Sequence, residues 1–207
     1  MTGNHNSMLM KTRDITVGIP FYSATSADEF ILSVDSILNQ TFQTLEIHFI
    51  QDGPISRELQ KVVNNYLLRH SNIMHIKLEK SNLATALNKS IRIADTKYYA
   101  RMDSDDISTP NRLMLQYEFL EANQNIFILG SWAIEFKKDI NDLDNFLKKM
   151  PYKYSEIIEF YHYRNPLIHP TVMFRKSVFN VLGYYNESFS SDQDLELWGR
   201  CIKSNIG

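Results

Sequence analysis

The feature that most constrains this chain is a regular alternation between short β-rich runs and longer helical stripes. The run Ile15 to Phe21 (ITVGIPF) is apolar and rich in β-branched residues, which is typical of a buried strand. In Ala27 to Gln40 the apolar residues recur at helical spacing, and Leu45 to Ile50 (LEIHFI) returns to strand composition. This order predicts a βαβ unit, and a right-handed crossover makes its two strands parallel.

The same alternation continues up to residue 102. We expect helices across Ser56 to His70 and Leu83 to Ala94, and strands across Ile73 to Leu78 and Lys97 to Met102. The predicted fold class is therefore α/β, a Rossmann-like sandwich with a mostly parallel central sheet and helices on both faces.

Later segments alternate less regularly. The sequence predicts a helix from Pro110 through Ala122, strands at Ile126 to Phe136 and Thr171 to Phe174, a short helix at Ser177 to Leu182 and a final helix at Leu195 to Ser204. The chain then stops without the cap or tail of a finished domain, so we expect the natural protein to extend beyond it.

Length and composition indicate one globular domain. A chain of 207 residues with 43% hydrophobic residues can bury one sizeable core, here expected over residues 14–207 after a loose tail at residues 1–13. The formal charge of -2 argues against a broad nucleic-acid-binding surface. No segment approaches the roughly 20 apolar residues of a membrane span, so a membrane substrate would be met peripherally, from the surface.

An acidic cluster, Asp103-Ser104-Asp105-Asp106, follows the strand predicted at Lys97 to Met102. Three carboxylates in four residues repel one another, and a hard divalent cation such as Mg²⁺ or Mn²⁺ is the natural compensator. In isolation the cluster is more typical of a solvated turn with a helix N-cap. Its place at the carboxyl end of a strand favours a ligand site, because open α/β sheets bind ligands at that edge.

Asp52 follows the second predicted strand, in Gln51-Asp52-Gly53. Its carboxylate could accept a hydrogen bond from a base N–H while Gly53 lets the backbone turn tightly. The alternative interpretation is an ordinary Asp-Gly turn.

Seven motifs, taken in their order along the chain, resemble those of a known family. They are ITVGIPFY, IQDG, SNLATALNKSI, YYARMDSDD, HPTVMFRKSVF, GYYNESF and DQDLELWGR. Together they resemble glycosyltransferase family 2, of the GT-A fold, and in particular its bacterial members that build surface polysaccharides and O-antigens.

The resemblance implies a nucleotide-binding half at residues 14–106 and an acceptor-side half at residues 107–207. It implies an inverting, metal-dependent, hexosyltransferase-type enzyme that uses a nucleotide-sugar donor, mostly a UDP-sugar. The acceptor class is a hydroxyl of a glycan or lipid-linked oligosaccharide. The location implied is cytoplasmic, with peripheral contact at the inner face of the cell membrane.

The resemblance also implies the donor-site residues. By motif position these are Pro20, Phe21, Tyr22, Asp52, Asn82, Asn88, Arg101, Asp103 and Ser104. Leu83 stands where the family commonly has glycine. Arg101 could contact phosphate or brace the carboxylates, and a structural ion pair is the alternative. The DxD-like element maps onto Asp103 and Asp105, with Asp105 the stronger metal ligand for Mn²⁺ or Mg²⁺.

A base that removes the acceptor proton maps onto Asp194, ahead of the last helix. Gln193 departs from the family's common Glu-Asp pair, and Asp192 is a second candidate. The alternative for Asp194 is a carboxylate at a helix N-terminus, favoured by the macrodipole.

His169 and Trp198 could contact the diphosphate or the acceptor. A structural hydrogen bond for His169 and a core position for Trp198 are the alternatives.

Two other functions compete with a glycosyltransferase. One is a nucleotidyltransferase, although no glycine- and basic-rich triphosphate loop is seen near the N-terminus. The other is a non-catalytic sugar-nucleotide-binding subunit, which the Gln193 departure would suit. The sugar, the acceptor linkage and the oligomeric state are not readable from the sequence.

Overall fold

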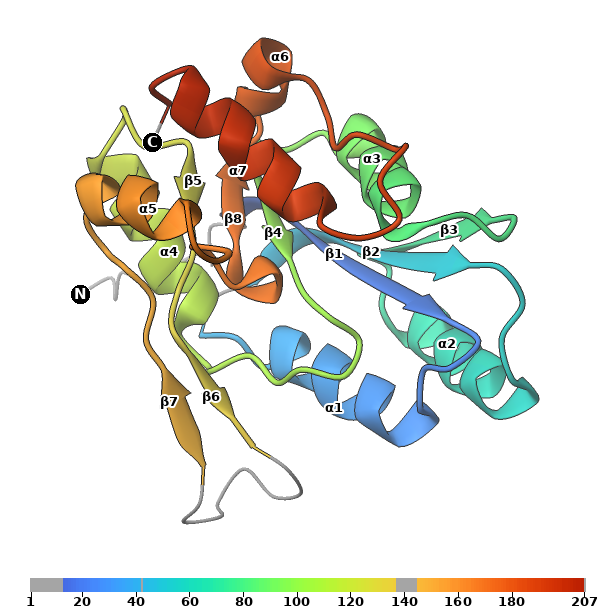
Figure 1. The fold of residues 1–207 in the computed structure, drawn as a ribbon. Coiled ribbons are helices and arrows are strands. Elements are labelled where there is room, and N and C mark those ends of the chain that lie inside the picture. The colour runs from blue at the N-terminus through green and yellow to red at the C-terminus, as the bar shows by residue number, and fades with distance from the viewer. Residues whose placement is uncertain (1–12, 42, 137–144, 207) are drawn as a thin grey trace, which may run out of the picture.

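A six-stranded sheet with strand order β3-β2-β1-β4-β8-β5 forms the centre of the fold (Figure 1). The computed structural model describes residues 13–41, 43–136 and 145–206. Strands β1 to β4 are parallel, whereas β8 is antiparallel to both of its neighbours. The strands are β1 (Arg13–Tyr22), β2 (Thr44–Asp52), β3 (Ile73–Leu78), β4 (Tyr98–Arg101), β5 (Ile128–Leu129) and β8 (Met173–Arg175). The predicted mostly parallel sheet is confirmed.

Helices cover both faces of this sheet, as predicted. One face packs against α1 (Ala27–Leu38), α2 (Arg57–Arg69) and α4 (Arg112–Ala122), and the other against α3 (Leu83–Ile93), α6 (Val178–Leu182) and α7 (Gln193–Lys203) (Figure 1). The first three helices begin at side-chain caps, because Ser26, Ser56 and Asn82 each accept a hydrogen bond from a backbone N–H three residues on. Within the described ranges, no helix is both long and apolar enough to span a bilayer.

The smaller elements lie beside β8 and α4. Strands β6 (Ala133–Glu135) and β7 (Phe146–Lys148) form a separate two-stranded hairpin that projects from the body (Figure 1). Helix α5 (Tyr154–Tyr161) and the 3-10 helix η1 (His169–Thr171) complete the chain's path back to the sheet.

Three details differ from the sequence-based expectations. The strand expected at Ile126 to Phe136 is split between β5 and β6, because the chain leaves the sheet at Gly130, where the Ser131 N–H donates to Thr171 Oγ1 at 2.9 Å. Helix α4 begins at Arg112 rather than Pro110, and α7 begins at Gln193 rather than Leu195. Of the tail expected at residues 1–13, residues 1–12 lie outside the described residues, and residue 13 already belongs to β1.

Four aromatic rings close the core beneath α1 and α2. Phe21, Phe30 and Phe49 are at most 1% exposed, and Tyr66 is 9% exposed. The Phe30 ring centroid lies 4.9 Å from that of Phe21 and 5.1 Å from that of Phe49, in tilted and edge-on arrangements. The Tyr66 hydroxyl donates to Asp35 Oδ1 at 2.7 Å. This cluster fixes the end of β1 against α1.

The opposite face of β1 requires glycine at position 18. A Cβ atom there would lie 1.8 Å from the Tyr99 hydroxyl oxygen, because the Tyr99 side chain crosses β1 at that point. The same hydroxyl donates to Ser90 Oγ at 2.8 Å, and Ser90 Oγ lies 2.8 Å from His48 Nδ1. Gly18 therefore makes room for a buried polar contact between the sheet and α3.

The ring of Phe30 is the centre of the aromatic cluster, so we expect Phe30→Ala to lower the free energy of unfolding by about 3–5 kcal/mol. The cost combines lost burial with a cavity that the neighbouring rings cannot fill. Urea denaturation measures it. Leu68→Ala, at a side chain that is 87% exposed, is the matched control and should change the free energy by no more than about 0.5 kcal/mol. Equal losses in the two variants would contradict this packing.

His75 of β3 gives the protein an acid-sensitive component of stability. Its Nε2 atom lies 3.0 Å from Gln51 Oε1, and burial, with help from the charge of Lys77, lowers its pKa from 6.5 to about 4. Between pH 6.5 and about pH 4, His75 binds a proton in the unfolded chain but stays neutral in the folded protein. Stability from this group is complete above about pH 6.5 and is lost as the pH falls toward 4.

We expect His75→Gln to flatten the pH dependence of unfolding between pH 6.5 and pH 4. A single histidine contributes a slope of at most about 1.4 kcal/mol per pH unit in that window. Urea denaturation of the wild type and the variant at pH 7, 5.5 and 4.5 measures the difference. His162→Gln, at an exposed position, controls for the loss of a histidine. Parallel curves for the wild type and His75→Gln would refute the assignment.

Candidate active site

A cleft of about 440 Å³ opens at the carboxyl ends of β1, β2 and β4. Eight of the residues expected from the sequence line it, namely Pro20, Phe21, Tyr22, Asp52, Arg101, Asp103, Ser104 and Asp105. Five lining residues were not predicted, because they come from the loop after β1 and from helix surfaces whose approach no local motif encodes. These are Ala24, Thr25, Glu29, Leu83 and Ala86.

Strand register explains why a cleft forms at this edge. The ends of β1 and β2 are level, since Tyr22 pairs with Asp52, whereas β4 ends at Arg101, which pairs with Gly18. Strand β1 therefore extends past the end of β4. The chain after Arg101 turns into the acidic cluster beneath this overhang, and the Met102 N–H still donates to the Gly18 carbonyl at 3.1 Å. The notch between the two strand ends is the floor of the cleft.

Asp52 is held by the loop before α3. Its Oδ1 atom accepts hydrogen bonds from the Ser81 backbone N–H at 2.6 Å and the Ser81 hydroxyl at 2.9 Å. Gly53 follows with φ of 79°, a left-handed conformation that suits glycine and turns the chain away from the cleft. No hydrogen bond from the described residues reaches Oδ2. Asp52 can therefore accept an N–H from a ligand.

The acidic cluster is anchored from α1 and from Arg101. The Ser33 hydroxyl donates to the Asp103 carbonyl at 2.7 Å, which fixes the backbone of the turn. The Asp103 carboxylate pairs with Arg101, with Oδ1 2.7 Å from Nη2. Burial, reinforced by repulsion from Asp103 and Asp105, raises the pKa of Asp106 to about 6. The loop thus brings three carboxylates close to two arginines, the buried Arg101 and the partly buried Arg112.

Arg101 lies at the base of the cleft and makes fewer hydrogen bonds than its guanidinium group could make. Its side chain is only 3% exposed, and its Nε and Nη1 atoms have no hydrogen-bond partner in the described part of the chain. Buried polar atoms are rarely left without partners except where a ligand or water completes them. The expected bracing of a carboxylate is present, and two guanidinium nitrogens, Nε and Nη1, remain without a partner among the described residues.

The carboxylates of the cleft suit a metal ion that is also bound by phosphate oxygens more than one bound by protein side chains alone. Among the described residues, no group of three or more His, Cys, Asp or Glu side chains is arranged to hold a metal ion. Asp105 is exposed, Asp103 is one-third exposed, and both line the cleft. Mg²⁺ is commonly bound by one or two carboxylates together with substrate phosphates and water, and two such carboxylates fit that pattern.

Asn82 and Asn88 do not line the cleft; they tie α3 to the loop before α7. Asn82 caps α3 through Oδ1, and its Nδ2 donates to the Glu187 carbonyl at 2.9 Å. Asn88 is fully buried, donates to the Tyr185 carbonyl and to Glu187 Oε1, and accepts from the Tyr185 N–H. Leu83 lies between them and does line the cleft.

A second polar cluster lies near Arg101, where the residues before η1 meet the first turn of α7. Asp194, in the first turn of α7, is 9% exposed, and its Oδ2 accepts a 2.6 Å hydrogen bond from Asn165 Nδ2. His169 Nδ1 is 4.0 Å from the same oxygen, and His169 Nε2 is 2.8 Å from the Tyr185 hydroxyl. Burial and the charge of Arg101 hold the pKa of His169 well below 6.5, so this imidazole is neutral.

The two remaining predicted contacts are Trp198, whose ring lies edge-on to His169 with the centroids 6.1 Å apart, and Asp192. Trp198 is 2% exposed and its ring stacks on Phe174 at 5.9 Å, so the structure supports the core position and not the acceptor contact. Asp192 is exposed and precedes α7 with φ of 57°, and its side chain does not cap the helix. Neither residue lines the cleft.

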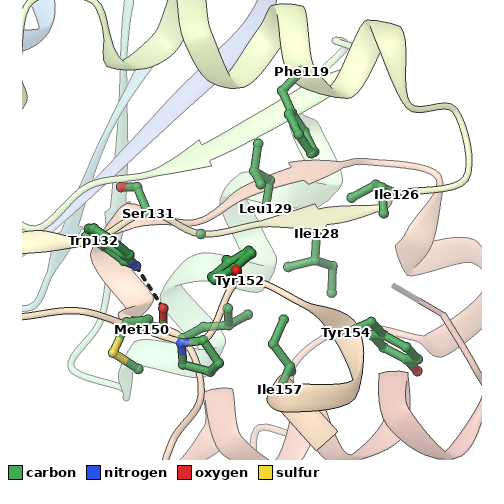
Figure 2. Close-up of a pocket in the computed structure, with 13 residues that line it drawn as sticks. Phe119, Ile126, Ile128, Leu129, Ser131, Trp132, Met150, Tyr152, Tyr154 and Ile157 are labelled. Carbon is green, nitrogen blue, oxygen red and sulfur yellow. Dashed lines mark hydrogen bonds between the residues drawn. The ribbon is translucent and has the colours of Figure 1, made fainter.

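A separate apolar cleft of about 540 Å³ lies between α4, β5 and α5 (Figure 2). Its lining includes Leu129, Trp132 and Tyr152, and the Trp132 indole N–H donates to the Met150 carbonyl at 2.8 Å (Figure 2). None of its lining residues, all in the described part of the chain, is charged or a histidine. The groups able to bind anions and move protons belong to the other two clusters.

Comparison with known proteins now adds to this geometry. Residues 16–183 match the family model described as Glycosyl transferase family 2. The O-antigen biosynthesis glycosyltransferase WbnJ of Escherichia coli is 32% identical over 84% of this chain and 67% of its own length. UDP-Gal:alpha-D-GlcNAc-diphosphoundecaprenol beta-1,3-galactosyltransferase, also of Escherichia coli, is 34% identical over 80% of this chain and 59% of its own length. The chain thus spans about two-thirds or less of the length of these relatives.

The fold has the same arrangement as a solved GT-A glycosyltransferase. The mannosyltransferase PcManGT of Pyrobaculum calidifontis, solved in complex with GDP-Man and Mn²⁺, superposes with a TM-score of 0.62 at 16% identity. The match covers 89% of this chain and 51% of that one. The GT-A fold expected from the sequence is thereby confirmed.

Removal of the Asp103 charge should be costly, because it leaves the Arg101 guanidinium buried without a counter-ion. We expect Asp103→Asn to lower the free energy of unfolding by about 2–3 kcal/mol, less than a fully buried pair because Asp103 is 33% exposed. Asp105→Asn, the matched control in the same turn, should stay within about 0.5 kcal/mol of wild type. Urea denaturation without nucleotide or divalent metal measures both. The assignment fails if the two variants are equally stable.

Proposed function

This chain belongs to glycosyl transferase family 2, and from that membership we propose that it transfers a hexosyl group from a nucleoside-diphosphate sugar to a hydroxyl of a glycan or lipid-linked acceptor, with inversion at the anomeric carbon. The carrying observation is the buried Arg101, which lines the cleft together with Asp103 and Asp105 and has two guanidinium nitrogens without a partner among the described residues. A cation facing the cleft next to exposed carboxylates suits a diphosphate bound together with a metal ion.

The base of the donor occupies the end of the cleft near Asp52. A carboxylate oxygen accepts hydrogen bonds only, so Asp52 selects bases that present an N–H at their recognition edge. Uracil, thymine and guanine do so through a ring N–H. The similar galactosyltransferase of Escherichia coli is named for UDP-Gal, and PcManGT was solved with GDP-Man; the bases of both nucleotides satisfy this condition. We propose a UDP-sugar as the donor, with Pro20, Phe21 and Tyr22 forming the wall beside the base.

The metal, Mn²⁺ or Mg²⁺, is held by Asp105 together with Asp103. When bound, it neutralises charge that develops on the departing diphosphate. Arg101 assists from below, because a guanidinium in a dry site stabilises developing charge more strongly than one in water. Ser104 lies within the turn and keeps the two carboxylates on the cleft side. The solved relative with Mn²⁺ supports this assignment.

Asp194 is the proposed base. It takes the proton from the acceptor hydroxyl as that oxygen attacks the anomeric carbon on the face opposite the diphosphate. The acceptor oxygen gains the bond to the sugar, the diphosphate oxygen takes the electron pair of the bond that breaks, and the proton goes to Asp194. His169 is neutral and contacts the acceptor or diphosphate from the same side.

The reaction belongs to cell-surface polysaccharide synthesis at the cytoplasmic face of the membrane, with a lipid-linked oligosaccharide as acceptor. Similarity to WbnJ and to a transferase named for a diphosphoundecaprenol-linked acceptor supports this placement. Membrane contact would then be peripheral and made by the protein surface.

The proposal predicts metal-dependent turnover that needs both halves of the site. We expect release of UDP from UDP-sugars, with and without acceptors, in Mn²⁺ or Mg²⁺ but not in EDTA. Asp105→Ala and Asp194→Ala should each reduce transfer by about 100-fold or more. Asp95→Ala is the control, because Asp95 is exposed at the opposite edge of the sheet, before β4.

A thermal-shift series separates binding from chemistry. Wild type and Asp194→Ala should both be stabilised by UDP-sugar plus Mn²⁺, since ligand binding raises apparent stability by mass action. Asp105→Ala should lose the metal-dependent part. Binding without turnover in any acceptor would indicate a non-catalytic subunit. Release of pyrophosphate from a nucleoside triphosphate would indicate a nucleotidyltransferase.

A further inference from the structure

Asp194 is unusual among the carboxylates of this site in being nearly buried. Its side chain is 12% exposed, whereas Asp105 is exposed and the side chain of Asp103 is 33% exposed. An ionised carboxylate loses hydration when buried, and it keeps its charge only if donors replace the lost water. The hydrogen-bond donors around Asp194 therefore fix the orientation of its carboxylate.

The Asp194 carboxylate has two hydrogen-bond donors among the described residues. The Leu195 backbone N–H donates to Oδ1 at 2.9 Å, and Asn165 Nδ2 donates to Oδ2 at 2.6 Å. His169 Nδ1, at 4.0 Å from Oδ2, is beyond hydrogen-bond distance, and its other ring nitrogen is engaged with the Tyr185 hydroxyl. Asn165 is thus the one side chain in this set that holds the carboxylate directly.

We propose that Asn165 is a positioning residue for the transfer reaction, which orients the Asp194 carboxylate toward the acceptor hydroxyl. This rests on the proposed function of Asp194 as base. A single donor on Oδ2 fixes the rotamer of Asp194 and leaves further lone pairs on both oxygens for an incoming hydroxyl. An amide is suited to the task because it donates without carrying charge or titrating.

The local structure makes Asn165 rigid enough for this role. Its Oδ1 atom accepts the Leu167 N–H at 3.2 Å across Pro166, so the side chain is held at both ends. Pro166 is buried and fixes the backbone angle of the turn that leads to η1. The two contacts use different atoms of one amide, and substitution can therefore separate a role in the turn from a role toward Asp194.

Two variants exploit this separation. Asn165→Asp keeps an oxygen for the Leu167 N–H but replaces the amide donor to Asp194 with a like charge that repels it. Asn165→Leu removes both contacts at similar volume. We expect both to lower kcat by roughly 100-fold or more, with KM and the dissociation constant for UDP-sugar within about threefold of wild type, because the donor cleft is intact.

Asn180→Asp is the matched control, because Asn180 is exposed in α6. It adds the same negative charge as Asn165→Asp and should keep wild-type kcat. Thermal denaturation and calorimetric UDP-sugar binding establish that each variant is folded. Wild-type kcat in Asn165→Asp with loss only in Asn165→Leu would assign Asn165 to the turn and overturn the proposal. An active Asp194→Asn variant, or no transfer by the wild type, would instead refute the proposed function beneath it.

Discussion

The buried guanidinium of Arg101 is the interaction on which both halves of the site depend. It pairs with Asp103 on the donor side, while its charge helps keep His169 neutral on the acceptor side. Backbone contacts fix its place, since the Arg101 N–H donates to the Val172 carbonyl and its own carbonyl accepts from Arg112 Nη2 at 2.8 Å. The charge of Arg101 stabilises the loop at residues 103–106, whose carboxylates repel one another. The backbone of Arg101 itself remains part of β4.

Strand direction explains how residues remote in sequence meet around that cation. Because β8 runs antiparallel to β4, the residues that precede β8 lie beside the carboxyl end of β4. His169 therefore comes close to Arg101 although 68 residues separate them in the sequence numbering. The loop before α7 is fixed in turn by Asn88, which binds Tyr185 through both backbone groups. The strand topology brings these segments together, and two amides, the buried Asn88 and the partly buried Asn165, fix their positions.

The donor half was predictable from sequence because its determinants are local. A β-rich run followed at once by Asp52 or by the acidic cluster puts carboxylates at one edge of a parallel sheet, whatever the loops do. The acceptor half depends on contacts between distant segments. The split at Gly130 follows from Thr171, and the donor to Asp194 is 29 residues away along the chain. Short strands and single turns give no periodicity strong enough to reveal such pairings.

Asp105 is exposed and Asp194 is nearly buried, and this difference fits the roles proposed for the two carboxylates. The proposed metal ligand, Asp105, must exchange water for a cation and release it, so exposure suits it. The proposed base, Asp194, instead needs a fixed orientation, because the acceptor hydroxyl must meet one of its carboxylate oxygens directly. The low exposure of Asp194 and the 2.6 Å hydrogen bond from Asn165 Nδ2 hold its carboxylate in one place.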